Sequence, residues 1–138
     1  MPHKINKLTS LTEPVKEELS EVWEKAVRSS HHFLTEQDLN YYRSRMKKVY
    51  LPAVEIYTIK KQRRIVAFMG LSDEMVEMLF VLPSEKGNGY GSPLLDFALS
   101  EKHINKIDVN EQNTDALRFY LHRGYKVICY ACFYSRLL

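Results

Sequence analysis

The segment PSEKGNGYGSPLL, residues 83–95, contains Gly87, Gly89 and Gly91, three of only five glycines in a chain of 138 residues. It follows the stretch EMVEMLFVL (residues 74–82), whose apolar side chains occupy both alternating sets of positions and predict a central strand covered on both faces. Ser92 and Pro93 predict the N-cap and first residue of a helix. A strand, a glycine loop and a helix in this order bind phosphate through exposed N–H groups and the helix dipole.

Glu77 interrupts the predicted apolar strand. A carboxylate is costly to bury unless it is paired or functional, and burial raises its pKa. We therefore expect Glu77 to be buried, and to serve either in a structural ion pair or in chemistry.

The remaining chain alternates helical and strand patterns. Pro14 and apolar residues at helical spacing predict a first helix within residues 13–34, and a second helix is expected from Thr35 to about Val49. Gly124 is expected to end the last helix. The predicted order is strand (3–8), two helices, three strands (51–60, 64–71 and 76–82), helix, strand (105–110), helix (113–123) and one strand in the tail.

Composition places the chain among folded proteins of one domain, since 45% of residues are hydrophobic and 27% are charged. The net charge of +3 is too small to indicate nucleic acid, although it suits a small anionic ligand. No apolar run approaches the ~18 residues of a membrane span, so we expect no membrane partner and a cytoplasmic location. Cys129 and Cys132 should point to opposite faces of a strand and the histidines are scattered, so no metal site is predicted.

Two familiar phosphate-binding patterns do not fit the glycine loop. A P-loop requires Lys after its last glycine, whereas Gly91 is followed by Ser92 and Pro93. A dinucleotide fingerprint starting at Gly89 requires glycine or alanine where Leu94 stands, and too little chain follows for a doubly wound sheet.

The stretch LFVLPSEKGNGYG (residues 79–91) resembles the acetyl-CoA loop of the GNAT superfamily of N-acetyltransferases, in which [QR]-x-x-G-x-[GA] follows a strand and precedes a helix. Lys86 stands where that family usually has Gln or Arg. NTDALRFYLHRGY (residues 113–125) resembles the second family signature, N-x-x-A-x-x-F-Y-x-x-x-G-[FY]. SHHFL (residues 30–34) and DVNEQN (residues 108–113) are similar to a YjaB-like bacterial subgroup.

The resemblance implies a single N-acetyltransferase domain over residues 1–138, monomeric or homodimeric. Its fold would be α/β (α+β), with a mixed, mostly antiparallel sheet of about six strands in the order β-α-α-β-β-β-α-β-α-β. The two central parallel strands, residues 76–82 and 106–110, would splay apart.

The resemblance also implies acetyl-CoA as cosubstrate and no metal. Backbone N–H groups of residues 87–92 would surround the diphosphate, and the exposed backbone of residues 79–81 would pair with the pantetheine arm as an added strand. The cofactor-binding residues implied are Leu79, Phe80, Val81, Lys86, Gly87, Asn88, Gly89, Tyr90, Gly91, Ser92, Asn113, Ala116 and Tyr120.

For catalysis, Glu77 would act as the general base, and Tyr120 would protonate the departing thiolate or donate a hydrogen bond to it. The acceptor would be a primary amine of a protein lysine, a protein N-terminus or a small molecule. His31, His32, Phe33 and Tyr42 could line its site, with His32 as an alternative base. A catalytically silent CoA-binding or sensor module of the same fold is the alternative function.

Overall fold

The structure is a computed structural model that describes residues 3–30, 34–109, 113–129 and 135–137. Its sheet has seven strands in the order β1-β2-β3-β4-β5-β7-β6. The strands are β1 (Asn6–Lys7), β2 (Glu55–Lys61), β3 (Arg64–Leu71), β4 (Val76–Val81), β5 (Ile107–Val109), β6 (Val127–Cys129) and β7 (Ser135–Leu137). Every neighbouring pair is antiparallel except β4 and β5, which are parallel. The predicted mixed, mostly antiparallel sheet is confirmed.

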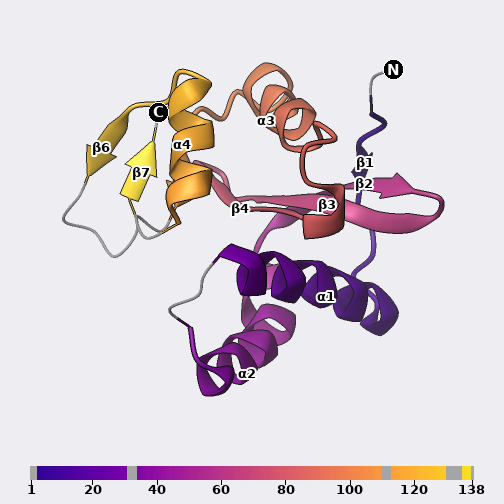
Figure 1. Ribbon diagram of the computed structural model, residues 1–138. Helices are drawn as coiled ribbons and strands as arrows, with labels where there is room; N and C mark the ends of the chain where they lie inside the picture. Colours follow the sequence, from indigo (N-terminus) through magenta and orange to yellow (C-terminus); the bar gives the residue numbers. More distant parts are fainter. Residues whose placement is uncertain (1–2, 31–33, 110–112, 130–134, 138) are drawn as a thin grey trace.

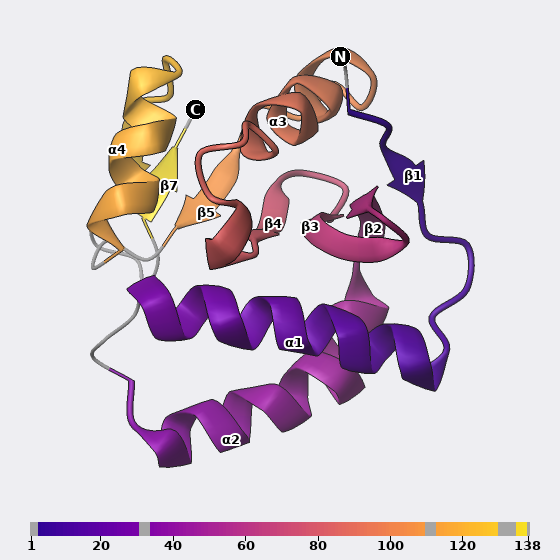
Figure 2. The same cartoon turned by 45° about the vertical axis from the view of Figure 1, so that its right-hand side comes forward.

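The helices lie on both sides of the sheet. The helices α1 (Glu13–Ser30) and α2 (Glu36–Arg45) lie together on one side, and α3 (Gly91–Ser100) lies on the other, as Figure 1 shows. In both ribbon views α4 (Thr114–His122) stands next to β7, at the end of the sheet away from β1 (Figure 2). The order of elements agrees with the sequence prediction as far as the tail.

The tail forms two strands, so the prediction of one strand there is wrong. β6 and β7 pair antiparallel, and β7 inserts between β5 and β6. A single strand through residues 125–138 would extend over more than ~40 Å, far beyond the three residues of β5. Cys129 ends β6, whereas Cys132 lies outside the described residues.

Two helix boundaries differ from the sequence prediction. After Arg45 the helical path changes to a π-helical segment, η1 (Met46–Tyr50), and then to a 3₁₀ turn, η2 (Leu51–Ala53). Pro52 in that turn has no N–H to continue the α-helical hydrogen bonds. At α3 the N-cap is Tyr90 and not Ser92. Pro93 fits either assignment because a first-turn N–H needs no partner within the helix.

The hairpin of β2 and β3 supplies the centre of the core. Gln62 and Arg63 both have positive φ angles, 53° and 67°, which matches a tight turn whose twist suits paired strands. Phe68 on β3 is fully buried, in the same apolar cluster as Leu19 of α1 and Leu94 of α3. The core therefore packs against both sides of the hairpin and holds β4, its next neighbour, in place.

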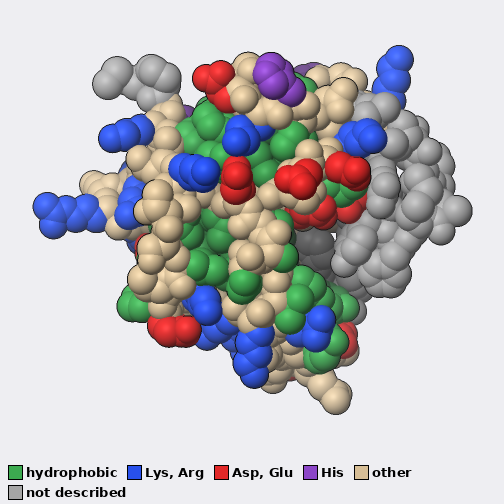
Figure 3. All heavy atoms as spheres, turned by 180° about the vertical axis from the view of Figure 1, so that it is seen from behind, with side chains coloured by type: hydrophobic (Ala, Val, Ile, Leu, Met, Phe, Trp, Pro, Cys, Tyr) green, Lys and Arg blue, Asp and Glu red, His purple; other side chains and the backbone are tan. Residues whose placement is uncertain are grey.

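Charged side chains differ in distribution over the surface. On the face seen from behind (Figure 3), Lys and Arg side chains are spread among apolar and polar ones, whereas several Asp and Glu side chains lie close together to the right of its centre. Over the described ranges, no helix combines the length and apolar character that a membrane crossing requires.

Gly70 of β3 is a packing-limited position, because a Cβ built there would lie 2.8 Å from Val54 Cγ2. We expect Gly70→Ala to lower the free energy of unfolding by about 1–3 kcal/mol through overpacking. Urea denaturation measures this change. The double variant Val54→Ala/Gly70→Ala should recover part of the loss, and a single variant as stable as the wild type would contradict the packing argument.

Candidate active site

The strands β4 and β5 pair at one position and then diverge. Val76 lies opposite Ile107, and the Val76 N–H donates to the Lys106 carbonyl at 2.8 Å. From Glu77 to Val81 the β5-facing edge of β4 has no strand partner within the described part of the chain. The predicted splay between the two parallel strands is thus confirmed, and it leaves backbone groups of β4 open to a ligand.

A cleft of about 1110 Å³ lies along this opening. Its walls come from β4, from the loop before α3, from α4, and from α1, α2 and η1 on the other side. The predicted site residues that line it are Tyr42, Glu77, Leu79, Phe80, Val81, Lys86, Gly87, Gly89, Tyr90, Gly91, Ser92, Asn113, Ala116 and Tyr120. His31, His32 and Phe33 lie outside the described residues.

Two of the three loop glycines are required by the backbone. Gly87 and Gly89 have φ angles of 90° and 80°, a region that residues with a Cβ rarely adopt. A Cβ on either would meet no protein atom within 4 Å, so space does not explain them. Gly91 is different, because its Cβ would lie 3.4 Å from Phe119 Cζ on α4. The first two glycines shape the loop, and a side chain at the third would be in van der Waals contact with the Phe119 ring.

The first turn of α3 presents N–H groups at the cleft. Its N-cap residue, Tyr90, forms no side-chain capping bond, and Gly91 and Ser92 line the cleft. Ser92 Oγ accepts a hydrogen bond of 3.1 Å from Arg123 Nη1, and Arg123 also pairs with Asp96. The contact fixes the start of α3 to the end of α4. The free N–H groups and the helix dipole favour an anion here.

Lys86 and Asn88 differ in their relation to the cleft. Lys86 lines it and pairs at 3.5 Å with Asp115 of α4, so the ion pair joins the loop to α4. Asn88 does not line the cleft, and its side-chain amide donates to Glu85 Oε1 at 2.8 Å. That hydrogen bond, together with Lys61, holds the pKa of Glu85 below its usual value.

Glu77 lines the cleft, but it is exposed, so its predicted burial is wrong. The register of β3 and β4 slips here: Gly70 faces Met78 while Leu71 faces Val76, which leaves Glu77 as the extra residue of a bulge. A bulge breaks the alternation of side chains and redirects the extra residue. Because β4 and β5 also diverge at this point, nothing from β5 covers the carboxylate.

Tyr120 is buried on α4, with 5% of its surface exposed, and it lines the cleft. Burial raises the pKa of its phenol well above the usual value, and the neighbouring Tyr125 raises it further. The rings of Phe119 and Tyr125 lie 5.5 Å and 6.0 Å from the Tyr120 ring. The phenol is therefore held neutral, as a hydrogen-bond donor at the cleft.

Asn113 is the N-cap residue of α4. Its Oδ1 accepts from the Ala116 N–H at 3.3 Å. The cap uses the side-chain oxygen, so the amide NH₂ is the group that can donate to a ligand. Ala116, one turn into the helix, lines the cleft with a side chain small enough to leave room beside Asn113.

The wall formed by α1, α2 and η1 is mostly apolar and aromatic. Tyr42, which the sequence analysis named as a candidate for the acceptor site, is half-buried in this wall. The sequence analysis missed the other members of this wall, among them Trp23, Val27, Asp38, Met46 and Tyr50. Helical periodicity indicates which of these side chains face inward, but it does not distinguish packing against the sheet from facing a cleft.

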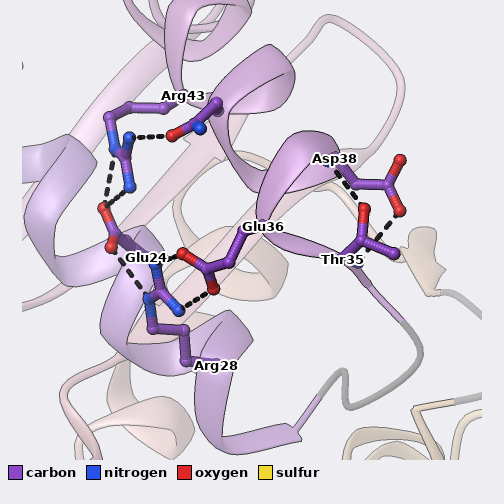
Figure 4. Close-up of polar contacts among 7 residues, drawn as sticks. Glu24, Arg28, Thr35, Glu36, Asp38 and Arg43 are labelled. Carbon is purple, nitrogen blue, oxygen red and sulfur yellow. Dashed lines mark hydrogen bonds and ion pairs between the residues drawn. The ribbon is translucent and has the colours of Figure 1, made fainter.

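Ion pairs join α1 and α2 on either side of residues 31–33 (Figure 4). Glu24 accepts from Arg28 Nε at 2.8 Å and from Arg43 Nε at 2.7 Å, and Arg28 also donates to Glu36. Partial burial would raise the pKa of Glu24, but the hydrogen bonds from Arg28 and Arg43 outweigh it and hold the pKa below its usual value. The network fixes the position of this wall.

Comparison with known proteins gives a consistent result. Residues 52–127 match the family described as acetyltransferase (GNAT) domain. The chain is 34% identical over 115 residues to the peptidyl-lysine N-acetyltransferase YjaB of Salmonella typhimurium, covering 80% of this chain and 77% of that protein. It is also 34% identical to YjaB of Escherichia coli, over 80% of this chain and 76% of that protein.

Solved structures share the fold. The solution structure of apo-form YjaB from Escherichia coli has a TM-score of 0.81 and 28% identity, covering 99% of this chain and 95% of that one. The crystal structure of the PaiA N-acetyltransferase from Thermoplasma acidophilum in complex with coenzyme A has a TM-score of 0.78 and 17% identity, covering 97% of each chain.

The raised pKa of Tyr120 predicts a loss of stability in alkali. Above pH ~10 the unfolded chain loses the phenolic proton while the folded chain keeps it, so stability falls by up to about 1.4 kcal/mol per pH unit for this group. Tyr120→Phe should flatten that slope, as measured by urea denaturation from pH 9 to 11. The same change at the exposed Tyr41 should not, and equal slopes for the Tyr120 variant and the wild type would refute the prediction.

Proposed function

The chain belongs to the GNAT family of acetyltransferases, and from that membership we propose that it transfers the acetyl group of acetyl-CoA directly to the side-chain amine of a lysine in a protein. The observation that carries the proposal is the cleft along β4, which has the glycine loop at one end and Glu77 and Tyr120 along its walls. The lysine acceptor is supported by the two relatives that are named peptidyl-lysine N-acetyltransferases.

At the loop end, the first turn of α3 and the backbone of residues 87–92 would bind the diphosphate of the cofactor. Lys86 would add a positive charge, exchanging its exposed pairing with Asp115 for the phosphate. A surface ion pair of this kind contributes at most about 1 kcal/mol and is readily exchanged. Along β4, the open backbone of residues 79–81 would pair with the pantetheine arm.

Glu77 would take up the proton that the amine must lose. A lysine amine with a pKa of ~10.4 is neutral in about one molecule of 2,500 at pH 7, which corresponds to ~4.6 kcal/mol. Glu77 stands at the bulge, between the open edge of β4 and the cleft. Because its side chain is exposed, we expect the bound substrates to exclude water from it and so to create the environment in which a base works.

Tyr120 would donate a hydrogen bond to the sulfur of the departing coenzyme A. A free thiol has a pKa of ~8.5, whereas the phenol of Tyr120 has a pKa raised above its usual value. Transfer of the phenolic proton to the thiolate is therefore uphill. Of the two roles expected for Tyr120, hydrogen-bond donor is the one that this direction favours, while backbone N–H groups of residues 79–81 would polarise the thioester carbonyl.

Binding tests the proposal first. Acetyl-CoA or CoA at 100 times its Kd should stabilise the protein by ~2.7 kcal/mol in a thermal shift measurement, while NAD should not. Gly87→Ala and Gly89→Ala should weaken this binding, because both positions require positive φ beside the diphosphate.

Gly124→Ala is the matched control. Gly124 has a φ of 94° and open space around its Cβ, but it lies outside the cleft lining. It should lose stability without losing cofactor affinity. An absence of response to acetyl-CoA and CoA would remove the proposal, and equal affinity in all three variants would remove the role of the loop.

The catalytic roles are tested by substitution. With a lysine peptide as acceptor, Glu77→Gln should lower kcat by about 10²–10⁴-fold. Tyr120→Phe should lower it by about tenfold, for the loss of one hydrogen bond to developing charge. Mass spectrometry of the peptide measures the rates, and CoA affinity should change little in either variant. Full activity in both would show the assignments to be wrong and would favour His32 as the base.

A further inference from the structure

A second hollow, of about 470 Å³, lies between α1, the start of β3 and η3 (Pro83–Glu85). Its polar lining is basic or hydroxylic and contains no carboxylate in the described part of the chain. The side chains concerned are Lys25, Arg28, Ser29, Arg64 and Ser84. Cations and hydroxyl donors gathered in this way match a phosphate group.

Two of the three cations are available to a ligand. Arg28 is held by Glu24 and Glu36 (Figure 4). Lys25 makes only an exposed pair with Glu21, at 3.4 Å. Arg64 is exposed, and it forms no ion pair within the residues that the structure describes.

Glu85 is the carboxylate whose charge acts on Arg64, and it already has other partners. The positive charge of Arg64 helps to lower the pKa of Glu85. Glu85 itself pairs with Lys61 at 3.2 Å and accepts from Asn88 at 2.8 Å. Arg64 can therefore turn to a ligand without leaving Glu85 uncompensated.

The hollow borders the cleft at its loop end. Ser29 and Pro83 line both. Pro83 begins the turn that leads into the glycine loop, whereas Glu77 lies six residues earlier near the other end of β4, about 20 Å away at 3.3 Å per residue. A group that neighbours the reacting lysine would lie near Glu77, whereas a group attached to the diphosphate end of the cofactor would lie near the hollow.

We propose that Lys25, Arg64 and Ser84 bind the 3′-phosphate of acetyl-CoA in this hollow. The Ser29 hydroxyl lines the hollow but donates to the Ala26 carbonyl at 2.8 Å, so its proton is already used. The proposal rests on the proposed function, which places the diphosphate at the glycine loop. The 3′-phosphate is joined to the diphosphate through one ribose, and it carries close to two negative charges at pH 7. The enzyme would thereby distinguish coenzyme A from its 3′-dephospho form.

The test pairs deletion of the phosphate with deletion of the cations. Titration calorimetry at low salt gives Kd for CoA and for 3′-dephospho-CoA. The wild type should bind CoA at least about tenfold more tightly than it binds 3′-dephospho-CoA. The double variant Lys25→Gln/Arg64→Gln should bind both ligands equally. Deleting the two cations from the protein removes the same interaction as deleting the 3′-phosphate from the ligand. Lys48→Gln, which removes an exposed charge outside the hollow, should keep the wild-type preference.

Each other outcome overturns the proposal. If the wild type binds the two ligands equally, the hollow does not bind the 3′-phosphate, and the proposed function is unaffected. A double variant that keeps the preference places the 3′-phosphate elsewhere. If that variant instead loses rate with a lysine peptide, the hollow serves the acceptor. Failure of the wild type to bind either ligand refutes the proposed function together with this inference.

Discussion

The cleft exists because β4 and β5 pair at one position and no further. Val76 and Ile107 set the pairing, and the strands diverge from Glu77 onward. Had the pairing continued, side chains from both strands would fill the space, and β4 would be the doubly covered strand that its composition predicts. The divergence leaves one edge of β4 open along residues 77–81, so that this strand lines the cleft.

The far wall is fixed by contacts between α4 and the segment that precedes or begins α3. Gly91 packs next to the Phe119 ring, Arg123 donates to Ser92, and Lys86 pairs with the first turn of α4. These contacts differ in nature, since the first is packing, the second a hydrogen bond and the third an exposed ion pair. Packing and the hydrogen bond set the width of the cleft, whereas the ion pair can exchange its partner when an anion binds.

The sequence predicted correctly those features that depend on the backbone conformation of a few neighbouring residues. The glycine loop and the stop at Gly124 follow from backbone preferences, and both were visible in the sequence. The exposure of Glu77 was not, because it depends on a register slip between β3 and β4 and on the absence of cover from β5. The basic hollow could not be predicted either, because its residues come from three elements that are far apart in sequence and meet only in the folded chain.

The two proposed catalytic groups differ in their access to water, and the chemistry requires this difference. The base must pass on the proton that it takes from the amine before the next turnover, and an exposed carboxylate on the cleft wall can release it to solvent. The donor to the sulfur must keep its proton through every turnover, and burial holds the Tyr120 phenol neutral. In the proposed reaction, the bulge that exposes Glu77 and the packing that buries Tyr120 would therefore act together, one by opening the structure locally and the other by closing it.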